Sequence, residues 1–387
     1  MASHPVHANV NGSTKAVIAG LIVAWMGAIT AAAASGDIPV PVPKPWNVGS
    51  GERPEPSFFK IATGSPGGTY FPIGSALAAI VSHPANSERC GDDERLCGPA
   101  GMQAVAQNSD GSVRNILAVN RGEVSSALAQ ADLVAAARDG RGPFAMPGKQ
   151  KNVRAIAGLY EESLHLVVAA TSDIESVRDL EGARISIGPK ASGTHDTARA
   201  VLKAFGLGDR ALKLSEHDAV EAADGLVAGE LDGFFFIGGT PVPVVAQLVE
   251  IDAVRLVPIE GPEIAALVKS WPMLHETSVP ATAYGTESAI ATLGVTALWI
   301  VHKDVSEDRV YRITRALWQD DNRDILKASH PIAASMRVDR AVDDLPVPLH
   351  PGAAKFYREI GLLPGKPGGE EAGTAPTTGK TDTVRSG

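Results

Sequence analysis

Short apolar runs alternate with segments of helical periodicity from residue 57 onward. The runs of strand length are FFKIA (58–62), AIAGLY (155–160), LHLVVAA (164–170), ARISIG (183–188) and LDGFFFIG (231–238). Within residues 193–208, Ala198, Val201, Leu202 and Phe205 recur at helical spacing, which predicts a helix that ends at the following glycines. Strands that alternate with helices predict an α/β fold whose parallel sheets are covered on both faces. Residues 308–326 and 353–363 predict two further helices.

The N-terminal segment, residues 1–34, is expected to be a secretory signal peptide. Lys15 precedes an apolar run from Ala16 to Thr30, and the small residues AAAASG follow it. A membrane anchor is the alternative, although this run is shorter than the roughly 20 residues that span a bilayer. We expect cleavage near Ala34 and a periplasmic location, and either alternative places the body of the protein outside the cytoplasm.

Composition separates the rest of the chain into a linker, a body and a tail. Residues 35–56 are rich in proline, which neither donates to a sheet nor continues a helix, so they predict an extended linker. Residues 366–387 lack apolar periodicity and are expected to be disordered. The roughly 310 residues between them are enough for two lobes, each with its own core.

Charge and cysteine content narrow the choice of function. The formal net charge is −9, which argues against a nucleic-acid partner because such binding needs a basic face. The two cysteines, Cys90 and Cys97, lie in CGDDERLCG. In an exported protein this spacing predicts a local disulfide, with a pair of free thiols as the alternative. A metal site would need more ligands, and no histidine lies beside them.

Three loops combine glycine with Ser or Thr between a strand and a helix. They are residues 63–69 (TGSPGGT), 192–194 (SGT) and 238–240 (GGT), and Pro241 is expected at the first helical position after the third. A weaker case is AQAD, residues 129–132. Helix N-termini carry unpaired N–H groups and about +0.5 charge, which suits an anion. A single loop of this kind can be only a turn or a cap, but together they predict a cleft for a small anionic ligand.

No catalytic signature accompanies these loops. The chain lacks G-x-x-x-x-G-K-[ST], and neither glycine loop that opens a helix contains G-x-G-x-x-G, so a nucleotide cofactor is not expected. G-x-S-x-G, S-x-x-K and H-E-x-x-H are also missing. His195 and Asp196 are adjacent on a helix and point in different directions, so they do not form a dyad. Glu161 and Glu162 are expected in a solvated turn. The sequence therefore predicts neither an enzyme nor a cofactor or metal site.

Five segments together resemble the TAXI family of TRAP-transporter substrate-binding proteins. They are TGSPGGTYFPIGSALA, AQADLVAAA, RAIAGLYEESLHLVV, VRDLEGARISIGPKASGTHDTARAVLKAFGL and PLHPGAAKFYREIGLLP, and the resemblance extends from about Phe58 to Pro364. CGPAGMQAVAQNSDGSVRNILAV is similar to a subgroup with a two-cysteine insertion. The resemblance implies a monomeric receptor of the type II periplasmic binding-protein fold. Such a receptor closes on a small organic anion or amino acid, such as glutamate, and delivers it to a membrane permease driven by an ion gradient.

The resemblance also implies a set of ligand-binding residues. They are Ser65, Thr69, Tyr70, Gln130 and Asp132 in the first lobe, Ser192, Gly193, Thr194, Phe236 and Gly239 in the second, and Glu162 and His165 near the crossover. The amides of Thr69 and of residues 192–194 are expected to take carboxylate oxygens, and Asp132 or Glu162 to pair with an ammonium group. Phe236 can equally be a core residue, and His165 can be structural. Phe71 stands where the family often has a second tyrosine.

Chain order predicts the lobe boundaries. The first lobe is expected at residues 57–162 and 277–365, and the second at residues 163–276, with a hinge between them. An exported enzyme or a sensor domain on the same fold is the alternative function. An enzyme should convert its bound ligand, and a sensor should carry a fused signalling segment, which the sequence does not show.

Overall fold

The computed structural model describes residues 57–84, 87, 89–90, 94–271 and 273–364. All of them belong to the second of the two units of the chain, residues 53–387. The predicted signal peptide, the Pro-rich linker and the C-terminal tail from residue 366 lie outside the described residues. Among the described residues, no helix is long and apolar enough to cross a membrane.

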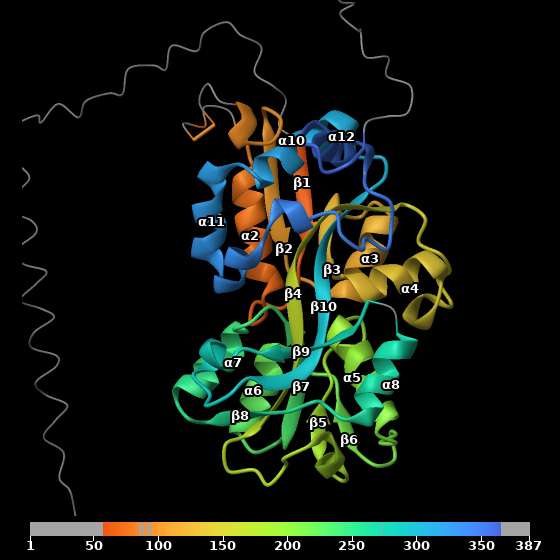
Figure 1. Ribbon diagram of the computed structural model, residues 1–387, viewed down its shortest axis with the longest axis vertical. Helices are drawn as coiled ribbons and strands as arrows, with labels where there is room; N and C mark the ends of the chain where they lie inside the picture. Colours follow the sequence, from red (N-terminus) through yellow and green to blue (C-terminus); the bar gives the residue numbers. More distant parts are fainter. Residues whose placement is uncertain (1–56, 85–86, 88, 91–93, 272, 365–387) are drawn as a thin grey trace, which may run out of the picture. The chain divides into compact units, whose positions relative to one another are not determined.

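A first group of strands and helices forms the lobe drawn uppermost in Figure 1. Its strand β1 pairs in parallel with both β2 and β3. The elements of this first lobe are β1 (Ser57–Ala62), α2 (Tyr70–Val81), β2 (Met102–Gln107), α3 (Ser112–Asn120), β3 (Ser126–Gln130), α4 (Ala131–Asp139), α10 (Glu307–Leu317), α11 (Arg323–Ser329) and α12 (Pro351–Glu359).

The second lobe contains a smaller set of parallel strands. Strand β5 pairs in parallel with β6 and β7. The elements are β5 (Arg184–Ser186), α5 (Gly193–Ala204), β6 (Lys213–Ser215), α6 (Ala219–Val227), β7 (Gly233–Gly238), α7 (Pro243–Glu250), β8 (Val254–Val257), α8 (Pro262–Ser270), β9 (His275–Val279) and α9 (Ala281–Tyr284).

Short 3-10 turns occur in both lobes. They are η1 (Glu94–Leu96), η2 (Gly142–Phe144), η3 (Val177–Leu180), η4 (Asp320–Asn322), η5 (Pro331–Ser335) and η6 (Val338–Arg340).

Two long antiparallel strands, β4 (Val153–Ala169) and β10 (Ile290–His302), pass through both lobes (Figure 1). The first part of β4 pairs with β10, and from Ser163 onward β4 pairs with β7 and β8. The strand order is therefore β2-β1-β3-β10-β4-β7-β5-β6 in one mixed sheet. The predicted α/β fold with two lobes of the type II binding-protein kind is confirmed. The expectation of purely parallel sheets is wrong, because these crossing strands run antiparallel to their neighbours.

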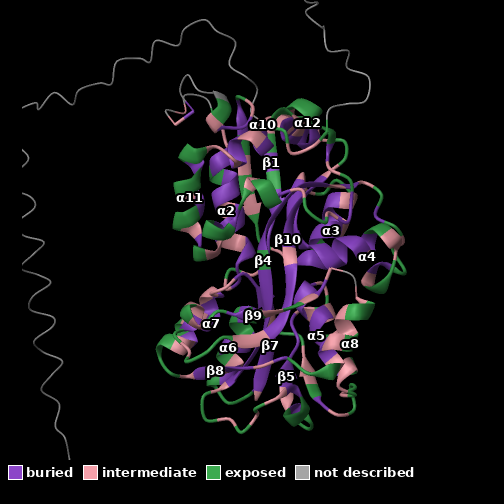
Figure 2. Cartoon of the chain, viewed as in Figure 1, coloured by how far each residue is buried: buried purple, intermediate pink, exposed green. Residues whose placement is uncertain are grey.

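The strands of this sheet are largely buried, as the purple ribbon in Figure 2 shows, and buried apolar clusters pack against them. In the first lobe, Ile61, Leu77, Trp299 and Ile313 belong to one fully buried cluster between the sheet and helices α2 and α10. A second cluster continues from α3 and α4 across β10 and β4 to α5 and α8. The apolar core is thus continuous between the lobes on the α4–α8 side.

Residues 277–294 change the expected lobe boundary. Val279, Tyr284 and Ile290 pack in the same apolar cluster as helices α6 and α7. Strand β9 pairs with the first part of β10, residues 290–294. We therefore propose that the second lobe extends to about Gly294, beyond the expected limit of residue 276. At the other crossing, β4 changes partners at Ser163, and we keep the boundary proposed there.

Two expected helix boundaries are corrected. The helix expected over residues 308–326 is interrupted after Leu317, because Gln319 is extended and the buried Asn322 amide donates to the carbonyl oxygen of Ala316 at 2.7 Å. Pro241 is not a first helical residue, because α7 begins at Pro243, which takes that position instead.

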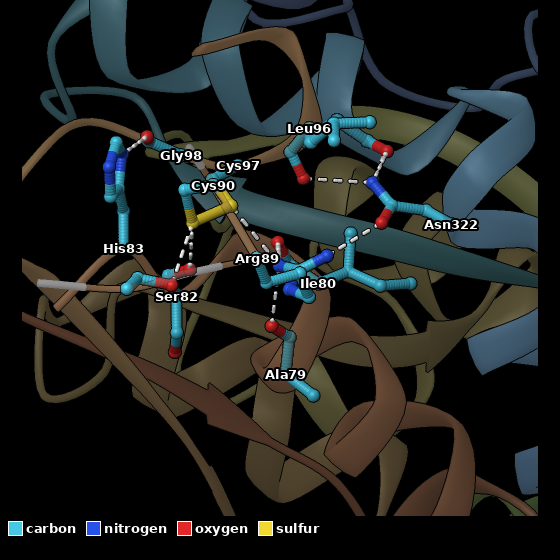
Figure 3. Close-up of a disulfide and its surroundings, with 12 residues drawn as sticks. Ala79, Ile80, Ser82, His83, Arg89, Cys90, Leu96, Cys97, Gly98 and Asn322 are labelled. Atoms are coloured by element: carbon cyan, nitrogen blue, oxygen red, sulfur yellow. Dashed lines mark hydrogen bonds between the residues drawn. A yellow bond between two sulfur atoms is a disulfide. The ribbon is translucent and has the colours of Figure 1, made fainter. Parts of the chain in front are cut away.

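The predicted disulfide between Cys90 and Cys97 is confirmed, with a Cα–Cα distance of 5.8 Å (Figure 3). Arg89 donates to the carbonyl oxygens of Ala79, at 2.9 Å, and Ile80, which lie in the last turn of α2. These carbonyl groups have no partner within a helix, and a cation suits this end of its dipole. Arg89 also donates to the side-chain oxygen of Asn322 at 2.6 Å. The disulfide loop therefore joins the end of α2 to the segment after α10.

Replacing both cysteines with serine is expected to lower the free energy of unfolding by about 2 kcal/mol, because a short closed loop restricts the unfolded chain. The melting temperature should fall by about 3 °C. Thermal unfolding with and without dithiothreitol checks this, since the reductant should affect the natural protein and leave the variant unchanged. Equal melting temperatures for the two proteins under oxidising conditions would contradict the prediction.

Candidate functional site

A cavity of about 350 Å³ lies between the two lobes, where five helix N-termini converge. Each of these helices follows a strand of a parallel set, and the carboxyl ends of parallel strands meet at one edge of a sheet. The lining residues at these N-termini are Thr69 and Tyr70 of α2, Gly111 and Ser112 of α3, Gln130 before α4, Ser192, Gly193 and Thr194 of α5, and Asp218 and Ala219 of α6. The convergence of these N-termini makes the cavity suited to an anion.

The buried side chain of Asn115 connects two loops near this cavity to strand β3. Its amide nitrogen donates to the carbonyl oxygens of Thr63, at 2.6 Å, and Leu128, at 2.7 Å, which lie near the ends of β1 and β3. Its oxygen accepts from Ser109 in the loop before α3 at 2.6 Å. One side chain thereby joins the loops that follow β1 and β2 to strand β3.

Glu162 is the buried carboxyl group of the cavity, with only 2% of its surface exposed. The Tyr70 hydroxyl donates to its Oε2 atom at 2.7 Å and lies 3.5 Å from the Ser112 hydroxyl. Burial raises the pKa of Glu162 to about 8, the Tyr70 hydrogen bond offsets part of that increase, and the charge of Asp132 adds to it. Burial also raises the pKa of Tyr70 well above its usual value.

The two lobes are in direct contact around the cavity. The Thr69 hydroxyl donates to the carbonyl oxygen of Gly239 at 2.9 Å, and the amide of Val244 donates to Gly67 at 3.2 Å. Near α5, the amide of Arg114 donates to the carbonyl oxygen of Ala191 at 3.0 Å. Hydrogen bonds therefore close the cleft both near α7 and near α5.

Most of the ligand-binding residues expected from the sequence line the cavity. They are Ser65, Thr69, Tyr70, Gln130, Glu162, Ser192, Gly193, Thr194 and Phe236. The amide of Ser192 already donates to the carbonyl oxygen of Pro189 at 2.8 Å. The amides of Gly193 and Thr194, in the first turn of α5, have no acceptor within their own helix. The buried Ser65 hydroxyl lacks a hydrogen-bond partner among the described residues.

Asp132 lies outside the cavity lining, in the first turn of α4, and only 2% of its surface is exposed. Burial raises its pKa to about 7 and the charge of Asp196 adds to this, while the Leu133 amide and the Trp271 side chain offset a part. Neither carboxyl oxygen makes a well-aligned hydrogen bond within the described part of the chain. Asp196, on α5, is also shifted, with a pKa raised to about 6 by burial.

His165 also lies outside the lining and has a structural environment. Its Nδ1 atom is 2.8 Å from the Ser163 carbonyl oxygen, which can only accept, so Nδ1 carries the proton. Its Nε2 atom, 2.9 Å from the Tyr284 hydroxyl, then accepts from that hydroxyl. Tyr284 in turn accepts from the amide of Val242 at 2.7 Å. Burial lowers the pKa of His165 to about 4, so it is neutral at physiological pH.

Phe236 lines the cavity near α7, and Gly239 lies beside it at the contact between the lobes. A Cβ atom on Gly68 would lie 2.7 Å from the ring of Phe236, so the ring packs directly on the backbone of the loop before α2. Gly239 contributes its carbonyl oxygen to Thr69 and is not among the lining residues. The third glycine loop, residues 238–240, therefore contacts the opposite lobe.

Sequence reasoning missed two parts of the lining. One is the loop before α3, with Asn108, Ser109 and Asp110, and the other is His217 and Asp218 before α6. The second had a usable signal, since Asp218 and Glu221 form a capping box at the start of α6. The expected solvated turn at Glu161 and Glu162 is wrong, because both residues lie inside the continuous strand β4. Glu161 is exposed and contacts His275 and Thr277, whereas Glu162 faces the cavity.

The charges at this site come from acids and helix dipoles. Among the described residues that line the cavity, the ionisable side chains besides Tyr70 and Glu162 are Asp110, His217 and Asp218, with no Lys or Arg. In the described part of the chain, no three His, Cys, Asp or Glu side chains are grouped so as to hold a metal ion.

The family model of the NMT1-like family matches residues 61–361, which include both lobes and every lining residue of the cavity. The chain belongs to the NMT1-like family. The match covers most of this chain. Membership of the TAXI family stays a prediction.

This NMT1-like protein is also similar to solved binding proteins, at low sequence identity. The alkanesulfonate-binding protein SsuA from Xanthomonas axonopodis pv. citri bound to MOPS is 14% identical, with 81% of this chain and 96% of that chain covered and a TM-score of 0.43. The periplasmic binding protein BugD is 12% identical, with 79% and 94% covered and a TM-score of 0.47. An ancestral arginine-binding protein bound to arginine is 16% identical, with 70% and 96% covered and a TM-score of 0.41. Similarity at this level does not identify the ligand of this chain.

Proposed function

We propose that the protein is an extracytoplasmic solute receptor for a small carboxylate or an amino acid such as glutamate. It delivers this ligand to the membrane permease of a TRAP-type transporter, as the TAXI resemblance implies, and it works in the periplasm as a monomer. The observation that carries the proposal is the convergence of five helix N-termini on one cavity of about 350 Å³. This volume lies in the range of small-molecule sites.

The lining residues divide into three roles in this proposal. The amides of Gly193 and Thr194 and the hydroxyl of Ser65 hold the ligand carboxylate at the positive end of α5. Tyr70 and Phe236 form apolar walls. Glu162 accepts from the ammonium group when the ligand is an amino acid. Asp132 and His165 lie outside the lining and do not touch the ligand, and His165 supports the surrounding backbone through Ser163 and Tyr284.

The combined substitution Thr69→Ala and Ser192→Ala is expected to abolish the increase in melting temperature that L-glutamate gives the natural protein. The reason is that Thr69 joins the lobes and Ser192 caps α5 by accepting from the amide of His195 at 3.1 Å. Thermal-shift measurements with amino acids and dicarboxylates check this, together with native mass spectrometry of protein purified without refolding.

A matched control is Ser306→Ala, because Ser306 caps α10 in the same way, by accepting from the amide of Arg309, away from the cavity. This variant should keep the ligand response. If no carboxylate or amino acid raises the melting temperature of the natural protein, the proposed function is wrong. Conversion of the bound ligand during incubation, seen by mass spectrometry, would point to an enzyme instead.

A further inference from the structure

Glu162 lies in strand β4, directly before the residue at which this strand begins to pair with β7 of the second lobe. It pairs with Val295 of β10, and the next residue, Ser163, is the first to pair with β7. Its side chain faces the cavity, and its neighbour Glu161 points to the opposite face of the sheet, where His275 lies 3.0 Å from its carboxylate. The carboxyl group of Glu162 is therefore accessible to a ligand but shielded from bulk water.

No fixed cation faces Glu162 within the described residues. The ionisable groups around it are Tyr70 on α2, Tyr160 on the same strand and Asp132 on α4. The cavity adds Asp110, His217 and Asp218. An ionised Glu162 would be buried in a small cavity among other acids, where the Tyr70 hydroxyl is the side chain that donates to it and the helix N-termini supply only partial positive charge. Burial therefore outweighs these groups, and Glu162 holds a proton near neutral pH, consistent with a pKa of about 8.

A ligand with an ammonium group changes this balance. Its positive charge supplies the partner that the empty cavity lacks, and a charge-assisted hydrogen bond to a buried carboxylate is stronger than one between neutral groups. A dicarboxylate without an amine gives the opposite result, because its charges add to those of the acids already present.

We propose that Glu162 is the proton-exchange group of the cavity, protonated when the cavity holds no ligand and ionised when an ammonium-bearing ligand binds. The proton leaves to the solvent, and the ligand ammonium takes its place beside the carboxylate. This inference rests on the proposed function, narrows its ligands to the zwitterionic amino acids and adds a dependence of affinity on pH. At pH values below the pKa of Glu162, affinity for such a ligand increases about tenfold for each unit by which the pH is raised. Affinity for a dicarboxylate does not increase over this range.

Isothermal titration calorimetry in two buffers of different ionisation enthalpy tests this proposal. The probes are L-glutamate and glutarate, which is the same molecule without its amine. At neutral pH, binding of L-glutamate should release about one proton per protein, and glutarate should release none and bind more weakly. Glu162→Gln should abolish the release and weaken L-glutamate binding by about tenfold or more. Tyr70→Phe should move the midpoint of the pH dependence to higher pH, because it removes a hydrogen bond that favours the ionised carboxylate.

Glu161→Gln is the matched control, since it changes the adjacent acid on the other face of the strand, and it should keep the proton release. Infrared difference spectra give a readout without ligand, because Glu162→Gln should remove the Glu162 part of the protonated-carboxyl band near neutral pH and leave the part that comes from Asp132. The proposal is overturned if L-glutamate binds without proton release, if Glu162→Gln releases the same proton, or if this band is unchanged. If neither L-glutamate nor any other amino acid or carboxylate binds, the proposed function fails, and this inference fails with it.

Discussion

Gly68→Ala is expected to lower ligand affinity by about 10- to 100-fold while leaving the fold intact. The added methyl group would lie 2.7 Å from the Phe236 ring, across the cleft. An overpacked contact of this kind costs about 1–3 kcal/mol. The cost applies only when the lobes are closed, so it reduces affinity by that amount and barely changes the stability of each lobe. Titration calorimetry with the best ligand of the thermal-shift screen measures the change.

Two further variants make this result specific to closure. Gly208→Ala is the matched control, because its added methyl group meets no atom within 4 Å, and it should bind as the natural protein does. Adding Phe236→Leu to Gly68→Ala should restore part of the affinity, since the smaller side chain removes the clash. Small-angle X-ray scattering with ligand should show the closed form for Gly208→Ala and a more open form for Gly68→Ala. Unchanged affinity in Gly68→Ala would show that the ligand does not need this contact.

The free energy of unfolding is expected to fall as the pH rises from about 4 to about 9, owing largely to Asp132 and Glu162. Burial raises the pKa of Asp132 from 3.8 to about 7 and that of Glu162 from 4.5 to about 8. Between the unfolded and folded pKa values, the folded protein holds a proton that the unfolded chain has lost. The resulting stability is fully present below the unfolded pKa and is lost as the pH rises through the folded pKa. Each group accounts for a loss on the order of 4 kcal/mol.

Asp132→Asn should therefore flatten the pH dependence, because an amide of the same shape does not ionise. Urea unfolding at several pH values gives the slope for the natural protein and the variant. Glu181→Gln serves as the control, since this carboxylate is exposed and its replacement should leave the slope unchanged. A variant Asp132→Asn that keeps the full slope would contradict the assignment of this dependence to Asp132.

The sequence predicted the parts of the cleft whose signals are local. Residues 63–69 and 192–194 contain glycine and lie between an apolar run and a segment of helical periodicity. Such a pattern reflects the local backbone conformation and can be recognised in a single sequence. The loop before α3 was missed, because β2 alternates exposed and partly buried residues at a sheet edge and gives no apolar run. The capping box of Asp218 and Glu221 can be recognised in the sequence as the start of α6. No local pattern, however, shows that the N-terminus of α6 faces the same cavity.

Glu162 shows why long-range information was needed. Two adjacent acids between apolar runs are typical of a turn, yet β4 continues through them because β10 pairs with both residues. Alternation then directs Glu161 outward and Glu162 inward. His165 and Asp132 are the reverse case, since their residue types suit a ligand but tertiary packing places them behind the cavity wall. Which polar residue reaches the cavity depends on strand pairing, which a single sequence does not specify.

The continuity of β4 has a mechanical consequence. One uninterrupted backbone passes from the first lobe to the second, and Glu162 lies on it beside the residue where its partner strand changes. A change in the backbone angle of β4 at this position would turn one lobe relative to the other, whereas a change in a loop at the edge of the cleft would move that loop alone. The resulting displacement would grow with distance from this position, toward the outer helices of each lobe. The acid beneath the ligand is thus coupled to the backbone about which the lobes would rotate.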